Sequence, residues 1–331
     1  MSARLLVEAL RDPSSVRLWN AKAWNGVISA ARAERLLATL AHRLDGADVP
    51  EPVARILADA CLDAERDKQI ALWEADRAMA VLAPLGIRVI LLKGAAYAAA
   101  GLKAGEGRMI GDLDILVPRA RMDEVEAALF GAGWEWVKPD PYDDAYYRQW
   151  MHELPPMIHR ERDRMIDVHH TILPLTARRT PDAEALIVDA VELLGGLYVL
   201  SPEDRVCHAV AHMLADGDLA GGLRNLWDIK YLIEDIDNIF ELKSRAALHG
   251  LSSHLNMARR LAAHIYEGSE RPLSLREQLI RDRLLGRDGW GKESNKLLGL
   301  GFYIRSHWLR MPPLMLMRHL WTKWRKGHRP V

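Results

Sequence analysis

The stretch GRMIGDLDILVP at residues 107–118 constrains the fold most, because it places two carboxylates inside an apolar segment. Successive side chains of a β-strand point to opposite faces. Asp112 and Asp114 would therefore project from one face, while Leu113 and Ile115 pack on the other. Two like charges this close repel each other unless solvent or a cation lies between them. The alternation predicts a strand whose polar face either meets solvent or lines a site for a cation.

The segments around this strand divide the chain into four regions. Residues 1–85 carry apolar side chains at three- and four-residue spacing, which predicts an N-terminal helical region. Residues 86–175 alternate short apolar runs with amphipathic stretches, which predicts a mixed α/β core. From Pro181 onward the helical period returns and predicts a C-terminal helical domain over residues 176–290, followed by a basic, Trp-rich tail at 291–331. The expected fold class is α+β, with a small mixed β-sheet flanked by N-terminal and C-terminal helical regions.

Composition and charge exclude several classes of protein. The 45 Lys and Arg residues balance 45 Asp and Glu residues, which argues against a general nucleic-acid binder. The two cysteines, Cys61 and Cys207, have no metal-ligand spacing and favour a reducing compartment. The N-terminal apolar run is interrupted by Glu8, and no uncharged apolar run of about 18 residues occurs. We therefore expect a cytoplasmic protein without a secretory signal or a membrane-spanning helix.

Three aspartates form the candidate chemical centre. Gly111 precedes Asp112 and Asp114 and leaves room for a ligand to approach the backbone. The strand candidate RMIDVHHTIL supplies Asp167, with His169 on the same face. Mg²⁺ prefers carboxylate oxygens, and a third carboxylate from a neighbouring strand suits a two-metal site. The alternatives are a solvated polar edge for the pair and a hydrogen-bonded buried role for Asp167.

Two cationic side chains in the same region could reach phosphate. Lys93 and Gly94 stand between the buried run IRVILL and an Ala-rich helix, and helix N-termini suit phosphate. Arg108 lies four residues before Asp112. The alternatives are a lysine at a strand end and an exposed loop arginine.

Two further pairs have the spacing of neighbours on a helix face. His208 and His212 have a spacing found in zinc sites, but no third ligand is evident, so a pair in the core or lining a site is favoured. Arg224 and Asp228 have the spacing of an intrahelical ion pair.

The order of these motifs resembles the uncharacterised bacterial nucleotidyltransferase family, which is similar to DNA polymerase beta in its catalytic core. The motifs are KGA, GDLDILV and IDVH, followed by LRNLWDI in a helical region, and the resemblance covers roughly residues 60–235. It implies that Asp112, Asp114 and Asp167 bind the metals. Ala95 departs from the superfamily pattern, in which Ser or Gly at this position helps to hold a phosphate. The residues implied to surround the nucleotide are Lys93, Gly94, Arg108, Gly111, His169, Arg224 and Asp228.

The resemblance also implies an activity. The protein would use Mg²⁺ or Mn²⁺ to transfer a nucleoside monophosphate from ATP or another nucleoside triphosphate to an unidentified acceptor hydroxyl. Asp167 could take the acceptor's proton. The acceptor could be a protein, a peptide, RNA, a sugar or a small molecule. The alternative is a non-catalytic nucleotide-binding or partner-binding module with the same fold.

The C-terminal tail is basic and aromatic. No acidic residue follows Glu293, whereas eight Lys and Arg residues do. Three interpretations stay open for residues 294–331. They could form a helix that packs back on the body, make a peripheral contact with an anionic membrane, or bind RNA or another polyanion.

Overall fold

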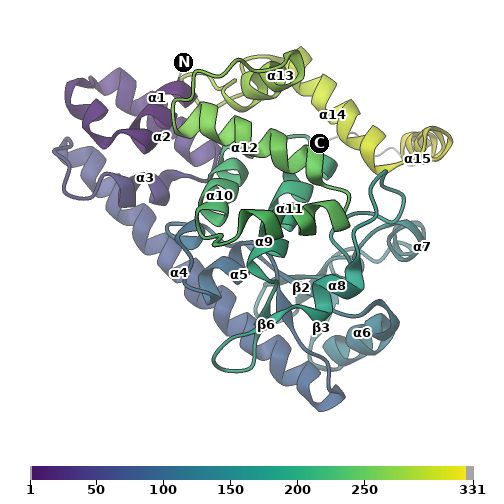
Figure 1. The fold of residues 1–331 in the computed structure, drawn as a ribbon. Helices are drawn as coiled ribbons and strands as arrows, with labels where there is room; N and C mark the ends of the chain where they lie inside the picture. The colour runs from purple at the N-terminus through teal and green to yellow at the C-terminus, as the bar shows by residue number, and fades with distance from the viewer. Residues whose placement is uncertain (1, 326–331) are drawn as a thin grey trace.

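A computed structural model describes residues 2–325 and shows helical regions on both sides of a mixed sheet (Figure 1). The sheet has seven short strands in the order β3-β4-β5-β2-β1-β7-β6, so the predicted fold class is confirmed. The strands are β1 (Ile90–Leu91), β2 (Asp112–Leu116), β3 (Trp134–Trp136), β4 (Met157–His159), β5 (Met165–His169), β6 (Val191–Glu192) and β7 (Tyr198–Val199).

The register around β2 sets the positions of the acidic residues. β2 pairs antiparallel with β1, where Ile90 lies opposite Leu116, and parallel with β5, where Asp114 lies opposite Asp167. Leu113 and Ile115 are buried on the opposite face of β2. The alternation in GDLDILV therefore predicts the faces of this strand correctly, and the parallel pairing brings the third aspartate beside the other two.

The region expected to be a C-terminal helical domain also contains two short strands, β6 and β7, that its sequence pattern does not predict. These two strands form a hairpin, and β7 extends the sheet by pairing with β1. Gly195 and Gly196 lie between them and have positive φ angles of 99° and 87°, which glycine adopts without steric strain. Strands of two residues are too short to show a period in the sequence.

Within the described residues, four α-helices precede the sheet: α1 (Ser2–Arg11), α2 (Ala21–Ala33), α3 (Leu37–Arg43) and α4 (Glu51–Leu82). The 32-residue α4 extends from the N-terminal helices past the sheet to α6 (Met122–Gly131), and it contacts α5 (Lys93–Ala99), α6 and β2 (Figure 1). The helices within the sheet region are α5 (Lys93–Ala99), α6 (Met122–Gly131) and α7 (Pro141–Trp150).

The C-terminal helices lie on the other side of the sheet from α4 (Figure 1). A π-helical turn, Ala211–Asp216, continues directly from α9 (Pro202–Val210). These helices are α8 (Ala183–Val188), α9 (Pro202–Val210), α10 (Gly222–Glu234), α11 (Ile239–Leu248), α12 (Ser252–Tyr266), α13 (Leu275–Leu284), α14 (Lys296–Arg310) and α15 (Pro313–Arg325).

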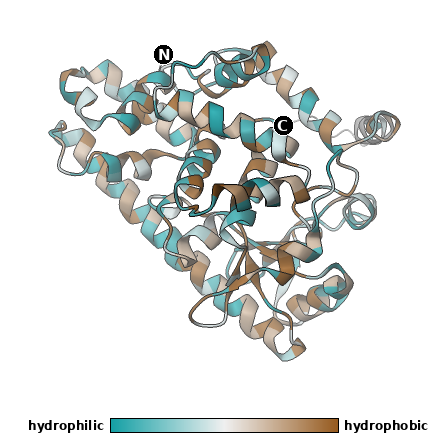
Figure 2. Ribbon diagram, in the orientation of Figure 1, coloured by the Kyte–Doolittle hydropathy of each residue, from teal (hydrophilic) through white to brown (hydrophobic). Residues whose placement is uncertain are grey.

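One hydrophobic core joins the N-terminal helices, the sheet and the C-terminal helices. Leu6, Leu82, Ile115 and Leu226 are all fully buried in it. Figure 2 shows the same arrangement, with apolar residues on the strands and on the helix faces turned toward them. Within residues 2–325, no helix is both long enough and apolar enough to cross a lipid bilayer.

Candidate functional site

Three carboxylates converge where β2 and β5 pair. One oxygen from each of Asp112, Asp114 and Asp167 lies within 4.8 Å of the others. Asp114 is buried, Asp167 is half-buried, and Asp112 is exposed. Because parallel register fixes this arrangement, two sequence segments that are more than 50 residues apart supply a single acidic cluster.

The cluster fits a divalent cation. Its donors are all oxygens, which hard cations such as Mg²⁺ prefer. The Oδ1 atom of Asp167 is buried, and within residues 2–325 it has no hydrogen-bond partner. A buried polar atom without a partner costs free energy, and a bound cation would satisfy it.

Asp114 is held by two basic side chains at the same oxygen. The Lys93 Nζ lies 2.5 Å from Asp114 Oδ1, and His169 Nε2 lies 3.0 Å from it. Burial alone would raise the pKa of Asp114, but Lys93 and His169 outweigh it and hold the pKa well below its usual range. Cations therefore compensate the repulsion between the two aspartates of GDLD.

Lys93 reaches this position from an unusual backbone conformation. It begins α5, a helix of only seven residues, with a φ of 48° in the left-handed region. Such a φ is uncommon for a residue with a Cβ and often marks a functional site. Although burial lowers the pKa of Lys93, Asp114 raises it above its ordinary value. The lysine therefore stays charged beside the cluster.

Asp167 behaves in the opposite way to Asp114. Burial, then the charges of Asp114 and Glu153, raise the pKa of Asp167 to about 7. In the absence of a cation, this carboxyl group exchanges its proton near neutral pH.

Sequence reasoning missed Glu153. Its Oε2 lies 3.3 Å from His169 Nδ1, and a single β-bridge joins the two residues. His169 thus lies between Glu153 and Asp114, and both carboxylates raise its pKa against the effect of burial. Glu153 and His169, together with His152, form a second group of potential metal ligands. The only signal in the sequence is the His-Glu pair before PMIHR, which has no periodic pattern.

Gly94 makes room for Arg108. A Cβ at Gly94 would lie 2.6 Å from Arg108 Nε, so the arginine crosses the glycine backbone. Arg108 forms an ion pair with Asp228. Its Nε is buried and has no hydrogen-bond partner among the described residues. By contrast, a Cβ at Gly111 would meet no atom within 4 Å, so space is open beside Asp112.

The structure brings Asp228 to the site and places Arg224 behind it. Arg224 donates to Asp228 Oδ1 from Nε at 2.8 Å and from a terminal nitrogen at 2.6 Å, so they form an intrahelical ion pair. Arg224 is 3% exposed and also donates to Thr39 and to the Ala104 carbonyl. Its contacts are with the protein itself, and through Asp228 it supports Arg108.

His208 and His212 line a narrow pocket together with Lys93, Arg108 and Asp228. Burial lowers the pKa of both histidines, that of His212 to about 3, so the rings are neutral. Among the described residues, neither belongs to a group of potential metal ligands. His208 and His212 are therefore better described as residues that line a site than as zinc ligands.

The fold and this acidic cluster define a class of protein in which a mixed sheet presents three carboxylates from adjacent parallel strands. A family model described as "uncharacterised nucleotidyltransferase" matches residues 20–267. The chain therefore belongs to this nucleotidyltransferase family, and the family prediction is confirmed. The match extends beyond the predicted 60–235 into both helical regions. No curated protein matches the chain.

Proposed function

We propose that this nucleotidyltransferase uses divalent metal ions to move a nucleoside monophosphate from a nucleoside triphosphate to an acceptor hydroxyl. The observation that carries the proposal is the convergence of Asp112, Asp114 and Asp167 within 4.8 Å. The buried, unpartnered oxygen of Asp167 supports a ligand at this point. Asp112, Asp114 and Asp167 would hold Mg²⁺ or Mn²⁺, and the bound ions would neutralise charge on the phosphoryl oxygens.

The protein's side chains would position the triphosphate and move one proton. The acceptor oxygen bonds to the α-phosphorus while the bond from that phosphorus to the pyrophosphate oxygen breaks. The hydroxyl proton passes to Asp167, directly or through a water molecule. Pyrophosphate leaves with the electron pair of the broken bond.

Lys93 and Arg108 are the cations for the phosphates. Both line the pocket beside the acidic cluster, and Arg108 Nε is a buried donor without a partner in the described part of the chain. Arginine and lysine bind phosphate through charge-assisted hydrogen bonds. Ala95 is buried in α5, so its side chain adds no polar contact to a phosphate. This departure leaves phosphate binding to Lys93, Arg108 and the backbone.

The test follows a label from the α-phosphate. Each of the four triphosphates, labelled at that position, is incubated with Mg²⁺ or Mn²⁺ and with protein, peptide, RNA, sugar and small-molecule acceptors. We expect transfer to one of these acceptor classes, and we expect Asp112→Asn to reduce the rate by about 100-fold or more. Asp59→Asn, at an exposed position of α4, is the matched control and should transfer at the wild-type rate.

Two outcomes would contradict the proposal. Transfer that persists in Asp112→Asn would place the chemistry elsewhere. Triphosphate binding without transfer to any acceptor would favour the alternative of a non-catalytic binding module.

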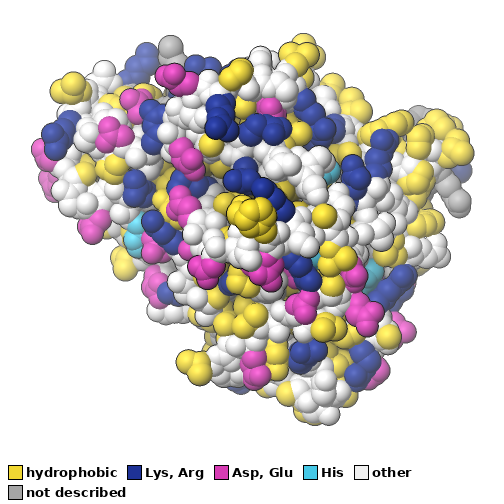
Figure 3. Space-filling model, in the orientation of Figure 1, with side chains coloured by type: hydrophobic (Ala, Val, Ile, Leu, Met, Phe, Trp, Pro, Cys, Tyr) yellow, Lys and Arg dark blue, Asp and Glu magenta, His cyan; other side chains and the backbone are white. Residues whose placement is uncertain are grey.

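We also propose that the tail makes a peripheral contact with an anionic membrane. α14 packs on the body through buried Phe302, and Arg310 pairs with Asp216. α15 instead exposes Leu314, Met317 and Trp321. Figure 3 shows hydrophobic side chains gathered over this helix. Exposed apolar and Trp side chains on a basic helix suit a membrane interface. Residues 326–331 of the tail lie outside the described residues.

A further inference from the structure

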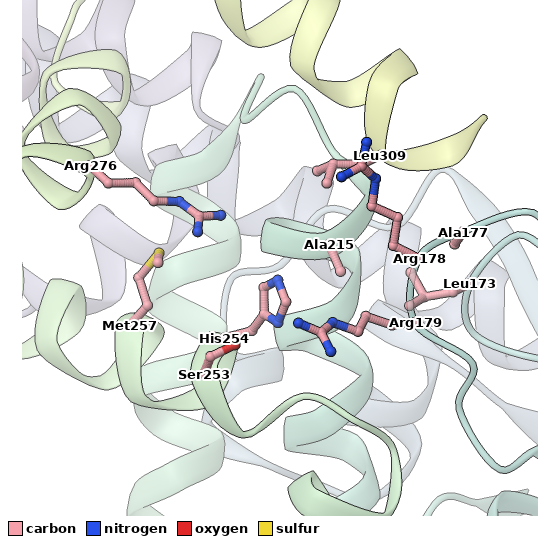
Figure 4. A pocket seen from close by; sticks show the side chains of 10 residues that line it. All are labelled: Leu173, Ala177, Arg178, Arg179, Ala215, Ser253, His254, Met257, Arg276 and Leu309. Carbon is pink, nitrogen blue, oxygen red and sulfur yellow. The ribbon is translucent and has the colours of Figure 1, made fainter. Parts of the chain in front are cut away.

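A second pocket lies among the C-terminal helices, away from the acidic cluster. Its walls come from the loop after β5, the π-helical turn, α12, α13 and α14 (Figure 4). None of Asp112, Asp114 and Asp167 lines it. The π-helical turn lies between the two places, because Ala215 lines this pocket and His212 lines the pocket beside the acidic cluster.

Two arginines point into this pocket and have no ion-pair partner in the described part of the chain. Figure 4 shows the guanidinium groups of Arg179 and Arg276 directed toward His254 from opposite sides. Within residues 2–325, neither arginine has a carboxylate within salt-bridge distance. Arg178 differs, because its guanidinium lies over the Trp308 ring at 4.8 Å from the centroid. Arg179 and Arg276 therefore remain available to a ligand.

His254 supplies a buried polar group at the same place. The side chain is 8% exposed, and its Nδ1 is buried with no hydrogen-bond partner among the described residues. Leaving such a group unsatisfied costs free energy, so a ligand with a polar atom here would be favoured.

The electrostatic environment of the pocket is positive. Burial first, and then Arg179, Arg276 and Arg305, lower the pKa of His254 to about 4. Arg305 donates to the carbonyls of Leu214 and Gly217. Burial and the charge of Arg276 lower the pKa of Arg305 to about 10. Like charges gathered beside a buried ring repel each other, and an anion would relieve that repulsion.

We propose that this pocket binds the phosphate group of a small molecule between Arg179 and Arg276, with a hydrogen bond to the His254 imidazole. Guanidinium groups match the oxygens of phosphate with paired, charge-assisted hydrogen bonds. Leu173, Met257 and Leu309 line the remainder of the pocket, so the rest of the ligand is apolar. The proposal does not depend on nucleotidyl transfer.

The experiment measures phosphate binding by calorimetry on the full, metal-free chain at constant ionic strength. We expect the double variant Arg179→Ala/Arg276→Ala to bind inorganic phosphate about tenfold or more weakly than wild type, because charge-assisted hydrogen bonds are lost. The matched control is Arg4→Ala/Arg66→Ala, which removes the same charge from exposed positions on α1 and α4. This control should bind phosphate as wild type does.

Two further arms define the ligand and the location of the site. Phenyl phosphate should bind wild type more tightly than inorganic phosphate does, and acetate should bind more weakly than either. His254→Gln, which keeps a polar side chain, should weaken binding less than the double arginine variant does.

Several results would overturn the proposal. They are an unchanged phosphate affinity in Arg179→Ala/Arg276→Ala, an equal loss in the control double variant, and equal affinity for acetate and phosphate. Circular dichroism of each variant would confirm that any loss of binding does not come from unfolding.

Discussion

At the scale of single residues, Asp114 is the electrostatic centre of the candidate active site. It is 3% exposed, and both Lys93 and His169 contact one of its oxygens. A buried carboxylate without such partners would be strongly destabilising. Asp167 lies opposite it across the parallel pair, forms no ion pair within residues 2–325, and has a raised pKa. Adjacent acids thus differ in protonation because their partners differ.

The pairing of Lys93 with Asp114 predicts a stability effect. We expect Lys93→Met to lower the free energy of unfolding by about 3 kcal/mol, because it leaves a buried carboxylate without its cation. Lys93→Met/Asp114→Asn should regain most of that loss, since the double variant removes the charge that needs compensation. Urea denaturation of the metal-free protein measures both values.

The control for this prediction is Lys68→Met on α4. Lys68 lies 3.3 Å from Glu65, but both side chains are exposed, so its loss should cost less than about 1 kcal/mol. Equal stability of Lys93→Met and wild type would show that the Lys93 pair contributes little.

The raised pKa of Asp167 predicts a pH dependence. Between about pH 4 and pH 7 the folded protein keeps this proton while the unfolded chain has lost it, so stability falls as pH rises. Asp167→Asn removes the carboxyl group and therefore this loss of stability. Its advantage over metal-free wild type should therefore grow across this window and level off above about pH 7, reaching at most about 4 kcal/mol.

Thermal unfolding of Asp167→Asn and of metal-free wild type between about pH 4 and pH 8 measures this difference in stability. The exposed control Asp59→Asn should follow wild type at every pH. Added Mg²⁺ should stabilise wild type but not Asp167→Asn. A constant difference between Asp167→Asn and wild type at all pH values would contradict the assignment.

At the scale of elements, short segments from distant parts of the chain complete the site. β2 and β5 supply the carboxylates, the β1–α5 turn supplies Lys93, and α10 supplies Asp228 as the partner of Arg108. The Arg108 side chain passes over Gly94, so the turn and α10 are joined through one arginine. A side chain added at this crossing would disturb several elements together.

Two glycine variants test that crossing. We expect Gly94→Ala to lower the free energy of unfolding by about 1 to 3 kcal/mol, because its Cβ would displace Arg108 from a well-packed position. Gly111→Ala is the matched control, since its Cβ would meet no atom within 4 Å and should leave stability nearly unchanged. Chemical denaturation compares the two. A Gly94→Ala variant as stable as Gly111→Ala would show that Arg108 moves aside at little cost.

At the scale of the whole molecule, one core joins the sheet to both helical regions, while α15 turns apolar side chains outward. The start of this helix packs near α7 through a small separate cluster that contains Tyr146, Met151 and Met311. The catalytic proposal depends on the main core, whereas the membrane proposal depends on the exposed face of α15. These two proposals can therefore be tested separately.

The tail prediction compares two pairs of exposed apolar residues. We expect wild type to sediment with anionic phosphatidylglycerol vesicles at low salt, and Leu314→Ser/Trp321→Ser to lose most of that binding. Leu18→Ser/Leu62→Ser changes residues that are also strongly exposed and should bind as wild type does. Nucleotidyl transfer should be unaffected in both variants. Wild type that stays in the supernatant would contradict the membrane proposal.

Local patterns in the sequence predict the strand at GDLDILV, the helix that begins at Lys93 and the three aspartates, because period and composition act over a few residues. The two short strands after Pro181 lack a period and could not be found in this way. The family match, over residues 20–267, includes all of these motifs.

The sequence alone determined which residues are ionisable and which faces of β2 are polar or apolar. The tertiary structure decided how those charges pair. Only the parallel register of β2 and β5 places Asp167 opposite Asp114, and only the folded loops bring Glu153 to His169 and Arg179 toward His254. Electrostatic interactions depend on distance and burial, and long-range packing sets both.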